Sequence, residues 1–142
     1  IVVTNQAGVA RGLFGESIIA RVHERLDELL AAREARIDRY YHCPHHPEGS
    51  VAKYAIECQC RKPRPGMLHR ASTEMHLDLA GSWLVGDKLS DLEAAAAAGC
   101  EPLLVTTGYG AETAARIERS SLAKTHIFAS LVDAVDFCLR AQ

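Results

Sequence analysis

The stretch SWLVGDKLSDLEAAAAAGCEPLLVT, residues 82–106, decides the fold class. Residues 82–85 form a short apolar run that predicts a buried strand. Residues 91–98 are rich in alanine, which favours a helix, and Gly99 suits the C-terminal cap of that helix. Residues 102–106 return to the pattern of a buried strand. A strand, a helix and a second strand in this order are typical of a parallel α/β sheet.

The same alternation continues along the rest of the chain. Apolar residues spaced at three and four positions predict helices, and short β-branched or aromatic runs predict strands. The sequence therefore predicts a single domain over residues 1–142 with one doubly wound parallel sheet, in which ligands bind at the carboxyl ends of strands. The further strands are expected at 1–4, 37–42 and 126–129, the helices at 16–36, 66–79, 111–119 and 131–140, and loops at 5–15 and 43–65.

Composition narrows the class of protein. The 142 residues are 48% hydrophobic and 24% charged, the balance of a globular protein, and no apolar run reaches the length of a membrane span. The formal net charge of −2 lacks the basic excess of a nucleic-acid-binding protein. The sequence shows no secretory signal, so we expect a cytoplasmic protein. We also expect a monomer that acts on a small molecule.

The loop over residues 43–65 carries most of the cysteines. Three cysteines and one histidine within 18 positions provide four ligands, and Zn²⁺ favours tetrahedral thiolate and imidazole ligation. Reduced loop cysteines with nearby histidines are the alternative interpretation. A structural zinc would close a loop that has little apolar material of its own. The predicted zinc ligands are Cys43, His45, Cys58 and Cys60, and His42 and His46 are rival ligands.

Two carboxylates follow the strand at 82–85 in the stretch GDKLSD, residues 86–91. Asp87 comes directly after the strand, and Asp91 stands four residues later at the start of a helix. Mg²⁺ takes carboxylates, waters and substrate phosphate oxygens as ligands. The spacing therefore allows a magnesium site at Asp87, with Asp91 as a further ligand. It equally allows Asp87 or Ser90 to cap the helix.

Two other stretches could bind phosphate. Arg61, Lys62 and Arg64 stand immediately before a helix, where free N–H groups also favour anions. Thr4 ends a strand, so its hydroxyl and the N–H groups after it can surround a phosphoryl oxygen. A solvated basic turn and an ordinary polar loop are the respective alternatives.

The order of these motifs is more specific than any one of them. A strand-end threonine, a lysine before a helix and a strand-end G-D-x-x-x-D resemble motifs two, three and four of the haloacid dehalogenase superfamily. The stretches TNQAGVARG, CPHHPEG, CQCRKPRPGM and GDKLSDLEAA carry the resemblance. A cysteine-histidine loop directly before the Arg-Lys motif resembles the branch that includes heptose bisphosphate and histidinol-phosphate phosphatases.

The resemblance implies a Rossmann-like fold and a two-step phosphoryl transfer. An aspartate of the family attacks phosphorus to form an aspartyl-phosphate, which water then hydrolyses, and a second aspartate acts as general acid and base. It implies that Lys62 neutralises the transferring group and that Asp87 binds Mg²⁺. The implied contacts to phosphate and substrate come from Thr4, Asn5, Arg11, Arg61 and Lys88, with Arg11 reaching the distal phosphate.

The nucleophile motif of the family, D-x-D-G-T, should precede Thr4, yet the 142 residues contain no D-x-D. The chain begins with Ile1 and not with Met, so we expect an N-terminal strand to be missing. The sheet would then lack a central strand. The chain by itself would be inactive.

The expected activity is hydrolysis of the 7-phosphate of a heptose 1,7-bisphosphate, in nucleotide-activated heptose biosynthesis for the lipopolysaccharide core or related glycans. The long spacing from His45 to Cys58 and the run AGVARG after TNQ resemble the heptose branch. A histidinol-phosphate phosphatase, or another phosphatase for small phosphate monoesters, is the enzymatic alternative. A zinc-binding module without catalysis is the alternative from another class, although such a module does not need Lys62 and Asp87.

Overall fold

The computed structural model describes residues 1–118 and 120–141. These residues form two compact units, Ile1–Arg61 (unit 1) and Lys62–Gln142 (unit 2), and each unit is described by itself. Both consist of helices and parallel strands. The expectation of one domain over residues 1–142 stays a prediction.

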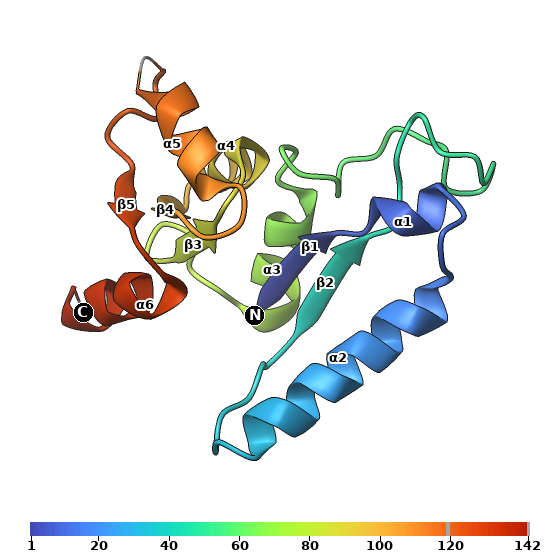
Figure 1. Ribbon diagram of the computed structural model, residues 1–142, viewed down its shortest axis with the longest axis horizontal. Coiled ribbons are helices and arrows are strands. Elements are labelled where there is room, and N and C mark those ends of the chain that lie inside the picture. The colour runs from blue at the N-terminus through green and yellow to red at the C-terminus, as the bar shows by residue number, and fades with distance from the viewer. Residues whose placement is uncertain (119, 142) are drawn as a thin grey trace. The chain divides into compact units, whose positions relative to one another are not determined.

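Unit 1 is built on a pair of parallel strands. Strand β1 runs from the N-terminus directly into helix α1 (Figure 1). In the register of the pair, Asn5 at the end of β1 lies opposite Cys43 at the end of β2, and the N–H of Gln6 continues the ladder to the carbonyl of Cys43 at 2.8 Å. The loop after Thr4 and the cysteine loop therefore begin at the same end of this sheet. The elements of unit 1 are β1 (Val2–Asn5), α1 (Ala7–Ala10), α2 (Glu16–Ala31) and β2 (Tyr40–Cys43).

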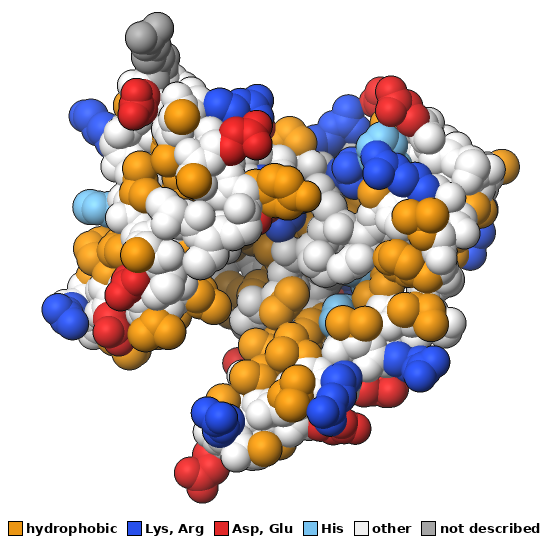
Figure 2. All heavy atoms as spheres, in the orientation of Figure 1, with side chains coloured by type: hydrophobic (Ala, Val, Ile, Leu, Met, Phe, Trp, Pro, Cys, Tyr) orange, Lys and Arg blue, Asp and Glu red, His pale blue; other side chains and the backbone are white. Residues whose placement is uncertain are grey.

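Helix α2 is shorter than the sequence predicted. It ends at Ala31, and not at residue 36, because Glu34 adopts a left-handed conformation with φ 58°. Ile19 is the buried residue of this helix, whereas Ile18, Val22 and Leu29 are exposed. Hydrophobic side chains accordingly lie between the charged residues of α2 on the face that Figure 2 shows.

Unit 2 contains a three-stranded parallel sheet in the order β3-β4-β5. Each strand is followed by a helix, the arrangement that the sequence predicted. No helix in the described part of the chain is long and apolar enough to cross a membrane. The elements of unit 2 are α3 (Gly66–Met75), β3 (Trp83–Gly86), α4 (Leu89–Ala98), β4 (Glu101–Val105), α5 (Gly110–Ile117), β5 (His126–Phe128) and α6 (Leu131–Arg140).

Strand β4 is the centre of unit 2. Its consecutive residues Leu103 and Leu104 are both fully buried, which requires cover on both faces of the sheet. On one side, Leu104 packs with Leu92 of α4 and Ile117 of α5. This packing fixes the positions of α4 and α5, and therefore of the residues between the strands and these helices.

The α/β class with parallel strands is confirmed. The described strands form two sheets, β1-β2 and β3-β4-β5, and none of them pairs with both β1 and β3, which agrees with the expectation that the predicted sheet lacks a central strand. Other helices also differ from the prediction. A short helix, α1, lies in the expected loop at 5–15, and α4 begins at Leu89 and not at residue 91. Helix α3 ends at Met75 and not at residue 79, since His76 adopts a left-handed conformation with φ 54°. The expected end of a helix at residue 119 lies outside the described residues.

Candidate active site and metal cluster

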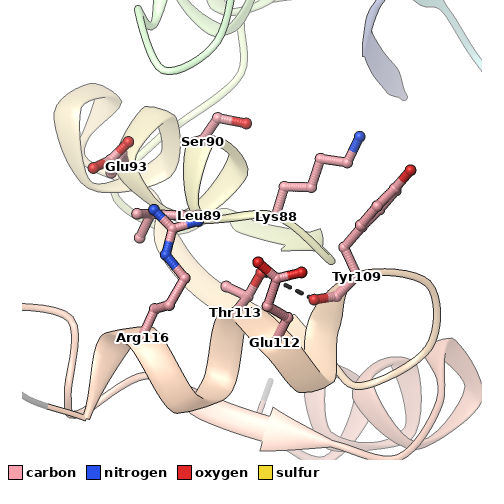
Figure 3. Close-up of a pocket in the computed structure, with 8 residues that line it drawn as sticks. All are labelled: Lys88, Leu89, Ser90, Glu93, Tyr109, Glu112, Thr113 and Arg116. Carbon is pink, nitrogen blue, oxygen red and sulfur yellow. Dashed lines mark hydrogen bonds between the residues drawn. The ribbon is translucent and has the colours of Figure 1, made fainter.

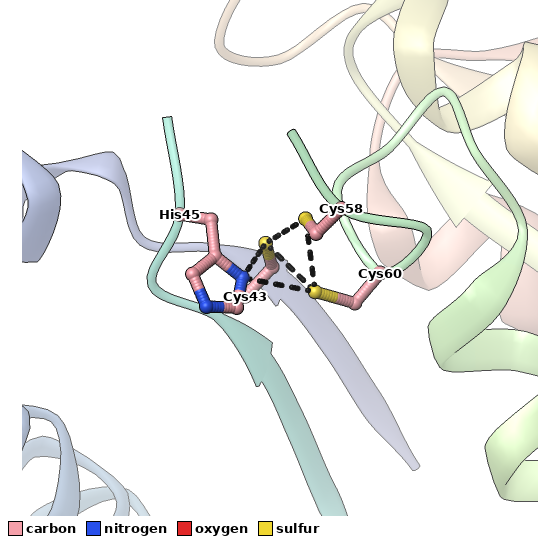
Figure 4. A group of neighbouring side chains, drawn as sticks. All are labelled: Cys43, His45, Cys58 and Cys60. Atoms are coloured by element: carbon pink, nitrogen blue, oxygen red, sulfur yellow. Dashed lines mark hydrogen bonds between the residues drawn. The ribbon is translucent and has the colours of Figure 1, made fainter. Parts of the chain in front are cut away.

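Four side chains of unit 1 converge at the end of β2 (Figure 4). The three sulfur atoms lie 3.1–3.5 Å from one another. The Nδ1 atom of His45 lies 3.7 Å from the Cys43 sulfur and 3.4 Å from the Cys60 sulfur. The cluster consists of Cys43, His45, Cys58 and Cys60, the ligand set that the sequence predicted.

The donor set of the cluster suits zinc. Zn–S bonds of about 2.3 Å in a tetrahedron place sulfur atoms roughly 3.8 Å apart. The observed sulfur separations of 3.1–3.5 Å are slightly smaller, so an ion requires only a small outward movement of the side chains. Three thiolates and one imidazole fill all four positions of a tetrahedral ion, which is typical of structural zinc and not of catalytic zinc.

The thiols of the cluster differ in acidity. Burial, together with the hydrogen bond to Cys60, raises the pKa of Cys43 far above its ordinary value. Burial also raises the pKa of Cys60. Burial acts to raise the pKa of Cys58 as well, but hydrogen bonds with Cys60 and Cys43 outweigh it and leave that pKa lowered. A metal ion must displace protons from the two less acidic thiols, so metal binding strengthens as pH rises.

The two rival histidines are engaged outside the cluster. Nε2 of His42 lies 3.1 Å from the carboxylate of Glu16 at the start of α2. Nδ1 of His46 accepts a hydrogen bond from the backbone N–H of Glu48 at 3.2 Å. The structure therefore groups His45, and neither of its rivals, with the three cysteines.

The cluster is linked directly to the predicted substrate arginine. The guanidinium of Arg61 donates a hydrogen bond to the backbone carbonyl of His45 at 3.2 Å. His45 thus contributes its ring to the cluster and its carbonyl to Arg61. Arg11, the other predicted substrate arginine of unit 1, lies at the C-terminal end of α1 with its guanidinium 3.5 Å from Nε2 of His46.

Thr4 and Asn5 occupy the last two positions of β1, where the sequence predicted a phosphate-binding loop. The Thr4 hydroxyl oxygen accepts a hydrogen bond from the side-chain amide of Gln6 at 3.1 Å. Gly8, in the short helix α1 that follows β1, packs tightly, since a Cβ there would lie 2.3 Å from the ring of Phe14. The loop therefore has a defined shape at the carboxyl end of the strand.

In unit 2, Asp87 stands directly after β3, as expected. Its Oδ2 atom accepts a hydrogen bond from the backbone N–H of Tyr109 at 3.0 Å. Among the described residues, Oδ1 of Asp87 accepts no hydrogen bond. A carboxylate oxygen at a strand end is a suitable ligand for Mg²⁺, which takes few protein ligands and keeps several waters.

Asp91, the further metal ligand that the sequence allowed, has partners within the protein for both of its carboxylate oxygens. Its Oδ1 atom forms an ion pair with Nζ of Lys62 at 2.8 Å, and the two side chains are only 9% and 11% exposed. Its Oδ2 atom accepts hydrogen bonds from the N–H groups of Asp87 and Lys88 at 3.3 and 3.0 Å. Asp91, and neither Asp87 nor Ser90, thus caps the start of α4 and holds Lys62 at the same time.

Lys88 lies at the surface, beside the exposed residue Tyr109 (Figure 3). Its Nζ atom is 4.2 Å from the centroid of the Tyr109 ring, within the range of a cation–π interaction. The two side chains border an open hollow of about 360 Å³ between the starts of α4 and α5. Lys88 is therefore accessible to a ligand, as its predicted supporting role requires.

The residues that hold Asp87 were not found from the sequence. Tyr109 and Thr113 contact Asp87 from the loop and helix that follow β4. The glycines of TTGYG, residues 106–110, are the feature that could have indicated a close approach of this loop to the strand ends.

The fold and both groups of side chains define a class of protein. A family model described as HAD-hydrolase-like matches residues 59–134, more than half of the chain. The chain therefore belongs to the HAD-hydrolase-like family, the haloacid dehalogenase type that the motifs resemble.

Curated proteins are also similar to this chain. The chain is 50% identical over 109 residues to D-glycero-beta-D-manno-heptose-1,7-bisphosphate 7-phosphatase of Salmonella typhi, covering 76% of this chain and 58% of the relative. It is 43% identical over 128 residues to the enzyme of that name from Photorhabdus laumondii, covering 87% of this chain and 68% of the relative. The chain thus spans less than two thirds of the length of the Salmonella relative.

Two solved structures are similar to this chain. The crystal structure of D,D-heptose 1,7-bisphosphate phosphatase from B. bronchiseptica, complexed with magnesium and phosphate, has a TM-score of 0.85 and 37% identity. The match covers 99% of this chain and 74% of that one. A putative HAD-like phosphatase from Mesorhizobium loti has a TM-score of 0.71 and 44% identity, covering 75% of this chain and 52% of that one.

Proposed function

We propose that the protein is a Mg²⁺-dependent phosphoric monoester hydrolase that removes the 7-phosphate of D-glycero-D-manno-heptose 1,7-bisphosphate. The observation that carries this proposal is the arrangement in unit 2 of Lys62, Asp87 and Asp91. A nearly buried carboxylate, Asp91, binds the ammonium of Lys62 with one oxygen and the backbone N–H of Asp87 with the other. Asp91 thereby fixes both the ammonium of Lys62 and the backbone of Asp87, the proposed metal ligand.

The arrangement suits phosphoryl transfer because charge on the transferring group must be met by preorganised cations and donors. Lys62 would stabilise that charge, and Asp87 would hold Mg²⁺. When bound, Mg²⁺ draws negative charge from a phosphoryl oxygen. Thr4 and Asn5 would bind phosphate, and Lys88 would support the site. Arg61 and Arg11 would recognise the substrate.

The proposed reaction needs an aspartate pair that the 142 residues do not contain. An aspartate of a D-x-D-G-T motif would attack phosphorus and release the sugar, after which water would cleave the aspartyl-phosphate. A second aspartate would donate a proton to the leaving oxygen and later take one from water. The activity is therefore assigned to the full-length protein and not to this chain by itself.

The cluster in unit 1 supports both the cofactor and the compartment that we propose. Structural zinc at Cys43, His45, Cys58 and Cys60 would keep the loop before Lys62 in one shape. Reduced thiols are the rule in the cytoplasm, where the reaction would belong to nucleotide-activated heptose biosynthesis for the lipopolysaccharide core or related glycans. The proposed enzyme acts as a monomer on a small sugar phosphate.

The experiment is a phosphate-release assay on the full-length protein with two substrates, heptose 1,7-bisphosphate and histidinol phosphate, each with and without Mg²⁺. We expect Mg²⁺-dependent release with a higher kcat/KM for the heptose bisphosphate. Preference for histidinol phosphate would select the other branch of the family. Retention of zinc without hydrolysis of any phosphate monoester would support a binding module and contradict the proposal.

A further inference from the structure

Asp87 is held at two points by the segment that follows β4. The backbone N–H of Tyr109 donates to Oδ2 of Asp87 at 3.0 Å, and the hydroxyl of Thr113 donates to the backbone carbonyl of Asp87 at 2.8 Å. The two donors lie 22 and 26 residues further along the chain. Both the side chain and the backbone of Asp87 are therefore fixed by an element other than its own strand.

The segment can approach Asp87 only because glycine stands at a required position. Gly108 has φ +63°, and a Cβ there would lie 2.4 Å from Oδ2 of Asp87. Gly110 begins α5, and a Cβ there would overlap the carbonyl oxygen of Val105. The loop between β4 and α5 thus wraps closely around the carboxylate.

Thr113 is held in place by the core. It is 4% exposed, and four residues later Ile117 packs with Leu92 and Leu104. Figure 3 shows Thr113 on α5 beneath Lys88 and Tyr109, with its hydroxyl bonded to the carbonyl of Tyr109, 3.2 Å away. A buried hydroxyl must be paired, and its shorter bond is the one to Asp87. The hydroxyl therefore connects the packed core to the strand end.

We propose that the segment over residues 106–113 positions Asp87 for Mg²⁺, with Thr113 as the main positioning residue. This inference rests on the proposed function. One oxygen of Asp87 is taken by the N–H of Tyr109, which leaves Oδ1 for the ion. Mg²⁺ demands near-ideal octahedral geometry, so a carboxylate that can rotate binds it less well. Hydrogen bonds that orient metal ligands contribute about 10- to 100-fold to metal affinity or activity.

The test uses the full-length protein and Mn²⁺, which takes the same oxygen ligands as Mg²⁺ and is visible by electron paramagnetic resonance. Thr113→Val keeps the shape of the side chain and removes its hydroxyl, so we expect Mn²⁺ binding about 10-fold weaker than in the unsubstituted protein. Thr113→Ser restores the hydroxyl and should restore most of the affinity. Thr73→Val is the matched control, because the Thr73 hydroxyl bonds to the carbonyl of His69 within α3.

Unchanged Mn²⁺ affinity in Thr113→Val would overturn the inference, and so would equal losses in the Val and Ser variants. Thr113→Ala provides the same comparison should the Val variant not fold. The experiment distinguishes failure of the proposed function from failure of the positioning role of Thr113. A protein that hydrolyses no phosphate monoester but loses Mn²⁺ affinity in Thr113→Val contradicts the proposed function alone. An active enzyme with an unaffected Thr113→Val variant contradicts the positioning role alone.

Discussion

Unit 2 holds its candidate site residues against a packed core, whereas in unit 1 the irregular loop that leads to Arg61 carries a cysteine-histidine cluster. In unit 2, Leu92, Leu104 and Ile117 fix α4 and α5 around Asp87. In unit 1, the loop from Cys43 onward is irregular, and three apolar residues of α2, Ile18, Val22 and Leu29, are exposed.

The difference indicates where each unit is vulnerable. Apolar burial contributes about 25 cal/mol for each Å² removed from water, so side chains supported by a core tolerate the loss of one polar contact. A loop closed by metal ligands depends on the ion instead, because the binding free energy is also folding free energy. A substitution such as Asp87→Asn, which leaves the core and the Lys62–Asp91 ion pair in place, should therefore impair chemistry at nearly constant stability, and metal removal should loosen unit 1.

The largest expected effect is that of Asp87→Asn in the full-length protein. Loss of the carboxylate charge weakens a hard-cation site, and the metal contributes several kcal/mol to catalysis, so kcat/KM should fall by at least about 10³-fold. An asparagine oxygen can still accept the N–H of Tyr109, so the melting temperature should change little. Steady-state kinetics across Mg²⁺ concentrations check this, with Asp136→Asn on α6 as the control. Near-normal turnover at ordinary Mg²⁺ would remove Asp87 from the site.

The next largest effect on activity is expected for Lys62→Ala. An ammonium that meets charge in the transition state contributes to kcat, and its loss should lower kcat by about 10²-fold or more. Because the change leaves Asp91 buried without its cation, it should also lower stability, and Lys62→Arg should recover most of that loss.

Arg61→Ala provides the kinetic contrast to Lys62→Ala. A residue that recognises the substrate should raise KM at least as much as its loss lowers kcat. An effect of Lys62→Ala on KM alone would make Lys62 an anion-binding residue without a role in the chemical step.

Most of the order of helices and strands could be predicted from the sequence, because it follows from apolar periodicity and glycine positions within short stretches. The same holds for the ligands of the cluster, which are close in sequence. The contacts between motifs could not be predicted. Lys62 and Asp91 were interpreted separately, as an anion-binding residue and a metal ligand, and only the fold pairs them. The hydrogen bond from Thr113 to Asp87 could not be predicted for the same reason, since it joins residues 26 positions apart that lie together only in the fold.

The smallest expected effect on catalysis, and the most local one, comes from the cluster. Elemental analysis should find one zinc per chain, and Cys58→Ser with Cys60→Ser should lose it, while Cys138→Ser outside the cluster should retain it. Hydrogen exchange should then increase over residues 43–60 and stay unchanged in α4 and α5. Equal increases in both units would show that the ion stabilises more than the loop of unit 1, and full zinc retention in the double variant would contradict the ligand assignment.

The most direct test of the proposed activity is phosphorus NMR of heptose 1,7-bisphosphate during turnover by the full-length protein with Mg²⁺. The proposed activity predicts that the signal of the 7-phosphate monoester disappears, that inorganic phosphate appears in equal amount, and that the anomeric phosphate remains. Loss of the anomeric phosphate first, or no change in either signal, would contradict it.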